Sequence, residues 1–195
     1  MQKSPFNSAR GFTLLELLIT TFIFIIVTSA VLANYPLFAS KVRLERDAQE
    51  IALSLRKAQS YALAVKESSA GSGVFPGYGV HFSKTSADSL IIYADIPTGP
   101  PLPEGNKLYD GDVEEVETFY IESARIEDIC EGVKSSAPGN CGIETVDITY
   151  LRPDPIIDLR NGSTAYNSDV EIKIISPTGD RKTIVIWKTG QISVE

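Results

Sequence analysis

The segment Gly11-Phe12-Thr13-Leu14-Leu15-Glu16 joins a short basic leader to an uncharged apolar run that continues to Ser40. The leader carries Lys3 and Arg10, and Glu16 is the one carboxylate in the first 40 residues. Because a helix rises ~1.5 Å per residue and a hydrocarbon core is ~30 Å thick, the run is long enough to span a bilayer. It is apolar on every helical face, which favours lipid surroundings over a single buried stripe.

A cleaved secretory signal would look different. It would have a shorter apolar core, followed by a cleavage site with two small residues. Ser29-Ala30-Val31 and Val31-Leu32-Ala33 are poor matches to such a site, and Gly11 lies before the run instead. The sequence therefore predicts an apolar helix that stays attached to the mature chain.

This arrangement resembles the type IV prepilin family, which includes the pseudopilins of type II secretion. The resemblance implies that a prepilin peptidase cuts after Gly11, and that Phe12 becomes a methylated N-terminus. Glu16 then takes the fifth mature position, where the family keeps a carboxylate. The implied organisation is a leader over 1–11, a transmembrane helix over 12–40, its amphipathic continuation over 41–67, and a globular β domain over 68–195. An uncleaved signal-anchored protein is the alternative.

Glu16 has a physical reason to be functional. An ionised carboxylate in hydrocarbon costs at least ~2.5 kcal/mol on insertion scales, so it needs a partner. The freed amine of a neighbouring subunit could supply one, and their attraction would fix the offset between subunits. The alternative is that Glu16 reaches the membrane surface. Tip subunits of the family often lack this carboxylate, so its presence argues against a tip role.

The charge is uneven along the chain. Its total is −7, and the part beyond Ser40 carries 16 basic against 24 acidic residues, or −8. An acidic outer domain repels phosphate backbones. The positive-inside rule does not orient the span, because Lys41, Arg43 and Arg46 follow it as closely as the basic leader precedes it.

After the span the pattern changes to one apolar stripe. Its spacings of three and four residues predict an amphipathic helix that continues the membrane helix. Pro36 removes a helical hydrogen bond and is expected to bend the rod, although many relatives carry such a proline where this chain has Ala33. The stripe could pack on the chain's own sheet or form a coiled-coil seam. Its members are Leu44, Ala48, Ile51, Leu55, Ala58, Ala62 and Val65.

Beyond Lys66 the chain alternates as strands separated by turn residues. The expected class is α+β, with one long helix packed on an antiparallel β-sandwich-like domain. The order of elements is similar to the H-type minor pseudopilins and FimT-like minor pilins; the Gly- and Asp-rich calcium region of major pseudopilins is not matched. The expected strands are 78–82, 89–93, 117–122, 125–129, 145–150, 170–176, 182–187 and 191–194, with a hairpin turn over 177–180.

Four other features are candidate sites. Cys130 and Cys141 would face an oxidising compartment and are expected to form a disulfide. His81, the only histidine, is interpreted as a β-face residue rather than a catalytic base. The segment 110–114 begins like a calcium loop but lacks the later glycine and closing glutamate, so a solvated acidic loop is expected. Asn161-Gly162-Ser163 is interpreted as a turn.

No catalytic set or phosphate-binding loop stands in a recognisable context, so the sequence predicts neither an enzyme nor a cofactor or metal site. The resemblance implies a structural subunit of the inner membrane, with its β domain in the periplasm or outside. Its implied partners are other pilin subunits, prepilin peptidase, an inner-membrane assembly platform and membrane lipid. The alternative is a FimT-like minor pilin that binds DNA for uptake. Only Arg181, Lys182 and Lys188 could serve there, which makes DNA an unfavoured partner.

Overall fold

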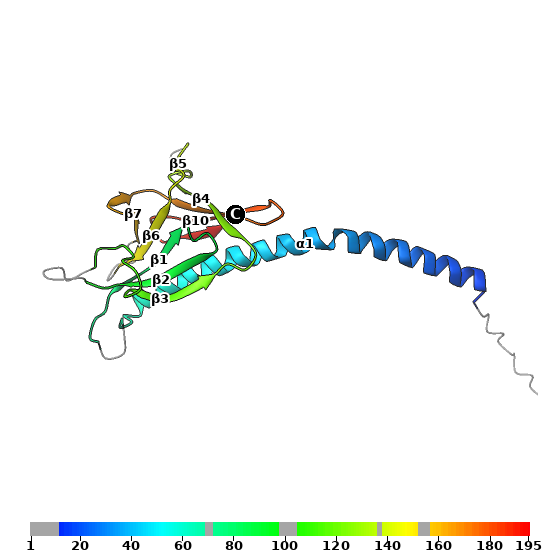
Figure 1. The fold of residues 1–195 in the computed structure, drawn as a ribbon, viewed down its shortest axis with the longest axis horizontal. Helices are drawn as coiled ribbons and strands as arrows, with labels where there is room; N and C mark the ends of the chain where they lie inside the picture. Colours follow the sequence, from blue (N-terminus) through cyan, green and yellow to red (C-terminus); the bar gives the residue numbers. More distant parts are fainter. Residues whose placement is uncertain (1–11, 69–71, 98–104, 136–137, 152–156) are drawn as a thin grey trace, which may run out of the picture. The chain divides into compact units, whose positions relative to one another are not determined.

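The computed structural model describes residues 12–68, 72–97, 105–135, 138–151 and 157–195. The chain divides into two compact units, Met1–Ala39 and Ser40–Glu195. The described residues form one helix, α1 (Leu14–Leu63), which runs from the first unit into the second, followed by strands only (Figure 1).

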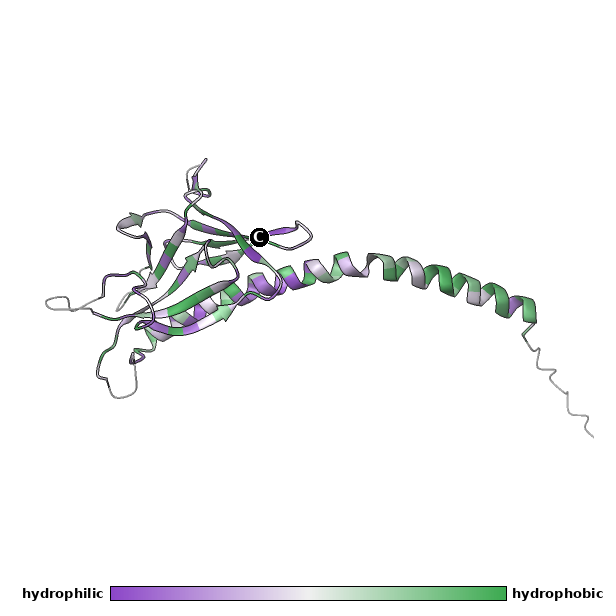
Figure 2. Ribbon diagram, in the orientation of Figure 1, coloured by the Kyte–Doolittle hydropathy of each residue, from purple (hydrophilic) through white to green (hydrophobic). Residues whose placement is uncertain are grey.

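The amino-terminal half of α1 is apolar all round (Figure 2). Its large side chains, from Leu14 through Phe38, are half exposed or more. The hydroxyls of Thr20, Thr21 and Thr28 donate to carbonyls three or four residues earlier in the helix, at 2.7–3.0 Å. Because these polar groups are satisfied inside the helix, they do not oppose its placement in lipid. Among the described residues, α1 alone is long and apolar enough to cross a membrane.

The carboxy-terminal half of α1 buries one face. The stripe expected from the sequence enters the core of the second unit from Leu44 to Ala62 and so packs on the chain's own strands. Val65 departs from it, because the helix ends at Leu63 and the Val65 side chain is about half exposed. Pro36 lies inside the helix without ending it.

Two antiparallel sheets complete the second unit. Sheet A has the order β3-β2-β1-β6-β7-β8, and sheet B the order β11-β10-β9-β4-β5. The strands of sheet A are β1 (Gly77–Ser83), β2 (Ser89–Asp95), β3 (Glu115–Tyr120), β6 (Thr145–Tyr150), β7 (Ile157–Asn161) and β8 (Thr164–Tyr166). The strands of sheet B are β4 (Arg125–Glu131), β5 (Asn140–Cys141), β9 (Val170–Ile175), β10 (Arg181–Ile186) and β11 (Ile192–Val194).

The inner faces of both sheets share one apolar core with the stripe of α1. On β1 the core residues are Tyr78, Val80 and Phe82, and on β9 they are Val170, Ile172 and Ile174. This alternation is the pattern of strands with one face inward. The expected α+β class, a long helix on antiparallel sheets, is confirmed.

The sequence patterns located most strands but missed three short ones. β5 has two residues, and β7 and β8 form a hairpin around the turn expected at Asn161-Gly162-Ser163. Pairing across a sheet, rather than periodicity, creates strands this short. Pro100, Pro101 and Pro103, which predict a long irregular connection after the second expected strand, lie outside the described residues.

Candidate functional site

Thr13 begins α1. Its side-chain oxygen accepts the N–H of Glu16 at 3.2 Å, and its carbonyl accepts the N–H of Leu17 at 3.1 Å. A hydroxyl that accepts from the third helical residue is an N-cap, and Thr-x-x-Glu is the sequence of a capping box. Thr13, the hydroxyl residue between Gly11 and Glu16, therefore caps the start of the helix. The sequence reasoning missed this role, although the Thr-x-x-Glu spacing indicates it.

Glu16 lies in the first turn of α1, and its side chain is exposed. The described residues place no ion-pair partner on its carboxylate. The helix dipole favours a negative charge in the first turn. Without an ion-pair partner among the described residues, the carboxylate is available to a cation of another chain. Phe12, 79% exposed, precedes the cap, and Gly11 lies outside the described residues.

Polar contacts hold the start of the second unit's helix against the β9–β10 hairpin. Ser40 Oγ lies 2.7 Å from Thr178 Oγ1, and Lys182 Nζ lies 2.8 Å from Glu45 Oε2. The hydrogen bond from Lys182 lowers the pKa of the Glu45 carboxyl. These contacts fix the direction of the helix against the hairpin at the first residues of this unit.

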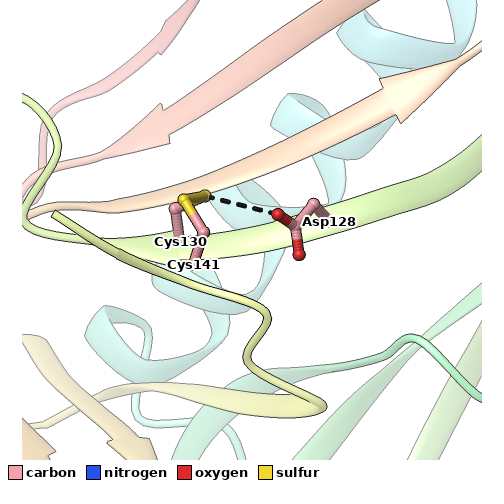
Figure 3. A group of neighbouring side chains, drawn as sticks. All are labelled: Asp128, Cys130 and Cys141. Carbon is pink, nitrogen blue, oxygen red and sulfur yellow. Dashed lines mark hydrogen bonds between the residues drawn. A yellow bond between two sulfur atoms is a disulfide. The ribbon is translucent and has the colours of Figure 1, made fainter. Parts of the chain in front are cut away.

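Cys130 and Cys141 are directly opposite each other on β4 and β5, and the structure joins them in a disulfide. Together with Asp128 they form the group in Figure 3, whose potential ligand atoms lie within 4.8 Å of one another. Because both sulfurs are used in the S–S bond, this group does not provide the thiolates that a metal would need.

A second polar group covers the outer face of sheet A. His81 Nδ1 on β1 lies 2.7 Å from Asp147 Oδ1 on β6, and the ring of Tyr109 packs on His81 at 5.0 Å between centroids. Tyr93 reaches across β1 to Thr149, with 2.6 Å between their hydroxyl oxygens. His81 is thus a sheet-face residue, as the sequence interpretation expected, and its contact with Asp147 is a feature that the sequence did not indicate.

Residues 105–114, here called the strap, lie on this face. Asp95 Oδ1 accepts the N–H of Lys107 at 3.0 Å, and Glu114 accepts from Ile96 and Asp110. The expectation of a solvated acidic loop is therefore wrong for Glu114, which is 2% exposed. The Glu114 carboxylate accepts hydrogen bonds from two backbone N–H groups and so holds this part of the strap in place. Burial raises the pKa of the Glu114 carboxyl.

The basic residues near the carboxyl end are already engaged. Arg181 makes a bidentate pair with Glu127, both distances being 2.6 Å. Lys182 pairs with Glu45, and Lys188 donates to the carbonyl of Tyr166 at 3.1 Å. A phosphate backbone would have to compete with these acceptors.

Comparison with known proteins identifies the amino terminus. Residues 6–32 match the model of the prokaryotic N-terminal methylation motif. No curated protein and no solved structure matches the chain. The match spans the expected cleavage point, Phe12 and Glu16, and it supports a type IV prepilin-like segment. It indicates a type IV pilin-like structural subunit rather than an enzyme.

Proposed function

We propose that this chain is a minor pilin or pseudopilin of a type II secretion or type IV pilus filament, and that it is of the H-type. The observation that carries the proposal is the motif match over residues 6–32, which overlaps the exposed and mostly apolar amino-terminal half of α1. In this proposal prepilin peptidase removes residues 1–11 and the new amine of Phe12 is methylated. The apolar half of α1 then anchors the subunit in the inner membrane, with its β domain in the periplasm or outside.

The chemistry of assembly follows from Glu16 and the freed amine. Within hydrocarbon each charge is unfavourable alone, and together they attract strongly. The Glu16 carboxylate has no ion-pair partner among the described residues, and it sits one turn from Phe12. An ammonium from a neighbouring subunit would neutralise it and set one axial offset. The assembly platform in the membrane would draw processed subunits into the filament.

The contacts described for the second unit do not favour the alternative of DNA uptake. The three basic residues that could serve donate to carboxylates or to a carbonyl. The acidic balance beyond Ser40 also opposes a phosphate backbone.

Removal of residues 1–11 by prepilin peptidase tests the proposal. Co-expression with a prepilin peptidase is expected to yield a mature chain that begins at Phe12, as measured by intact mass. Gly11→Val is expected to block the cut, because the β-branched side chain replaces the hydrogen at the scissile position. Ser8→Ala in the same leader serves as the matched control and should be cut normally. A wild-type chain that stays full length beside an active peptidase contradicts the proposal.

A further inference from the structure

The two sulfurs of the disulfide lie in different surroundings. Cys130 on β4 is fully buried, whereas Cys141 on the two-residue strand β5 is exposed. β5 is also an edge strand of sheet B, paired on one side only. An external reagent can therefore reach the sulfur of Cys141 but not that of Cys130.

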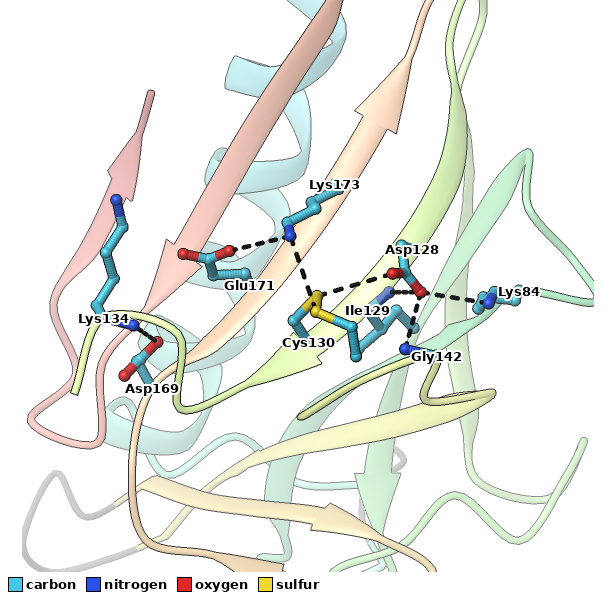
Figure 4. Close-up of a disulfide and its surroundings, with 10 residues drawn as sticks. Lys84, Asp128, Ile129, Cys130, Lys134, Gly142, Asp169, Glu171 and Lys173 are labelled. Carbon is cyan, nitrogen blue, oxygen red and sulfur yellow. Dashed lines mark hydrogen bonds and ion pairs between the residues drawn. A yellow bond between two sulfur atoms is a disulfide. The ribbon is translucent and has the colours of Figure 1, made fainter. Parts of the chain in front are cut away.

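The charges around the pair differ as well (Figure 4). Lys173 Nζ lies 3.9 Å from Cys141 Sγ. Cys130 Sγ lies 3.8 Å from Asp128 Oδ2, and Glu171 is the cross-strand neighbour of Cys130 on β9. The Asp128 carboxylate also lies within 4.8 Å of Cys141 Sγ, so the clearest charge difference between the sulfurs is the contact of Lys173 with Cys141. A cation beside a sulfur stabilises its thiolate, and a carboxylate beside it has the opposite effect.

Two more groups face the cluster. Lys84 Nζ lies 3.3 Å from Asp128 Oδ1, and Glu171 Oε2 lies 3.6 Å from Lys173 Nζ. The Asp128 carboxylate also accepts the N–H groups of Ile129 and Gly142. Asp128 and Lys173, the charged neighbours of the sulfurs, are thus each held by a second group of opposite charge.

We propose that Cys141 is the thiol-exchange site of this protein, at which external thiols and disulfides enter and leave. In reduction, a thiolate attacks Cys141 Sγ, forms a mixed disulfide there and releases Cys130 as a thiolate, which takes a proton from water. A second thiolate attacks the reagent sulfur, so that Cys141 leaves as a thiolate and the reagent is oxidised to its disulfide. Oxidation of the reduced pair by a reagent disulfide follows the same steps in reverse.

This assignment makes the exchange directional. Lys173 attracts the incoming thiolate and stabilises the Cys141 thiolate, whereas Asp128 makes Cys130 a poor leaving group. The pair therefore resists reduction once formed, and the mixed disulfide forms only on Cys141.

Limited alkylation of the reduced full chain in detergent tests the assignment. With iodoacetamide below stoichiometry at pH 7, peptide mass analysis should find Cys141 labelled at least ~10-fold more than Cys130, because access and thiolate fraction both favour it. Equal labelling, or more label on Cys130, would overturn the proposal.

Lys173 variants separate electrostatics from structure. Lys173→Gln should slow alkylation of Cys141 roughly fivefold at pH 7, and the difference should shrink near pH ~9.5, where Cys141 reacts mainly as its thiolate in wild type and variant alike. Lys173→Arg should keep the wild-type rate, and Lys182→Gln on β10 is the control. If the alkylation rate of Cys141 in Lys173→Gln falls equally at both pH values, or falls in Lys173→Arg as well, the role given to the Lys173 charge is contradicted.

Discussion

At the scale of single residues, Val65 stands in an unfavourable conformation. Its φ is 54°, and its N–H and that of Lys66 bond back to the carbonyls of Ala62 and Tyr61. This is the Schellman pattern, whose left-handed position normally holds glycine. A β-branched side chain there is strained, by about 1–2 kcal/mol.

Val65→Gly is therefore expected to stabilise the second unit by ~1 kcal/mol, because the relieved strain exceeds the added chain entropy of glycine. Thermal or denaturant unfolding of the full chain in detergent measures the change. Val74→Gly is the matched control: Val74 is also a partly exposed valine, without positive φ, and its replacement should lower stability. A decrease in both variants would show that Val65 is not strained.

At the scale of elements, the strap depends on carboxylates that lie under it. Asp95 is 1% exposed at the end of β2, and a Cβ added to Gly105 would overlap its carboxylate. The backbone of the strap therefore closes tightly on this group. Burial raises the pKa of Asp95 to about 6, against the lowering effect of the Lys107 N–H.

The raised pKa of Asp95 determines how its contribution to folding stability changes with pH. Because the folded pKa lies above the unfolded value, Asp95 favours folding most below pH ~4, and this contribution is lost as the pH rises through about 6. Asp95→Asn keeps an acceptor for Lys107 but no longer titrates. Between pH 7.5 and 4.5, the stability of wild type should rise relative to the variant by about 2 kcal/mol.

Chemical unfolding at a series of pH values measures this difference. Asp112→Asn, an exposed acid of the same strap, should follow the wild-type curve. Parallel curves for wild type and Asp95→Asn would mean that Asp95 does not take up a proton on folding.

At the scale of the whole molecule, the chain combines an exposed apolar unit with an acidic folded unit. In the described part of the first, the large apolar side chains are exposed, and such a surface is favoured in lipid or against other apolar helices. The second has its own core, shared by α1 and both sheets. Glu16 is the single charge in the described part of the first unit, so assembly can be tested there without disturbing the second.

Glu16→Leu should leave membrane insertion and leader removal intact, because leucine is favoured in lipid. Filament incorporation should nevertheless fall sharply, since the neighbour's ammonium would stay unpaired near hydrocarbon. Crosslinking to filament partners measures incorporation, and Glu45→Gln, a change in the second unit, is the control. Crosslinking at the wild-type level would mean that Glu16 is only a tolerated interfacial residue.

The sequence by itself determined the features that depend on neighbours along the chain. The apolar run, the stripe from Leu44 to Ala62 and the β9–β10 turn follow from composition and period, and the structure contains each of them. The methylation segment was also readable, because its residues lie at fixed spacing within 32 positions.

Only the tertiary structure decided features that depend on contacts across the sheets. A Cβ on Gly79 would lie 2.5 Å from Cζ of Tyr93, so this glycine is needed for the ring that crosses β1 to Thr149. The burial of Glu114 against the N–H groups of Ile96 and Asp110 is a second such feature. The placing of Lys173 beside Cys141 results from strand register. Register joins residues far apart in the sequence through packing of the whole core, and local periodicity does not encode that packing.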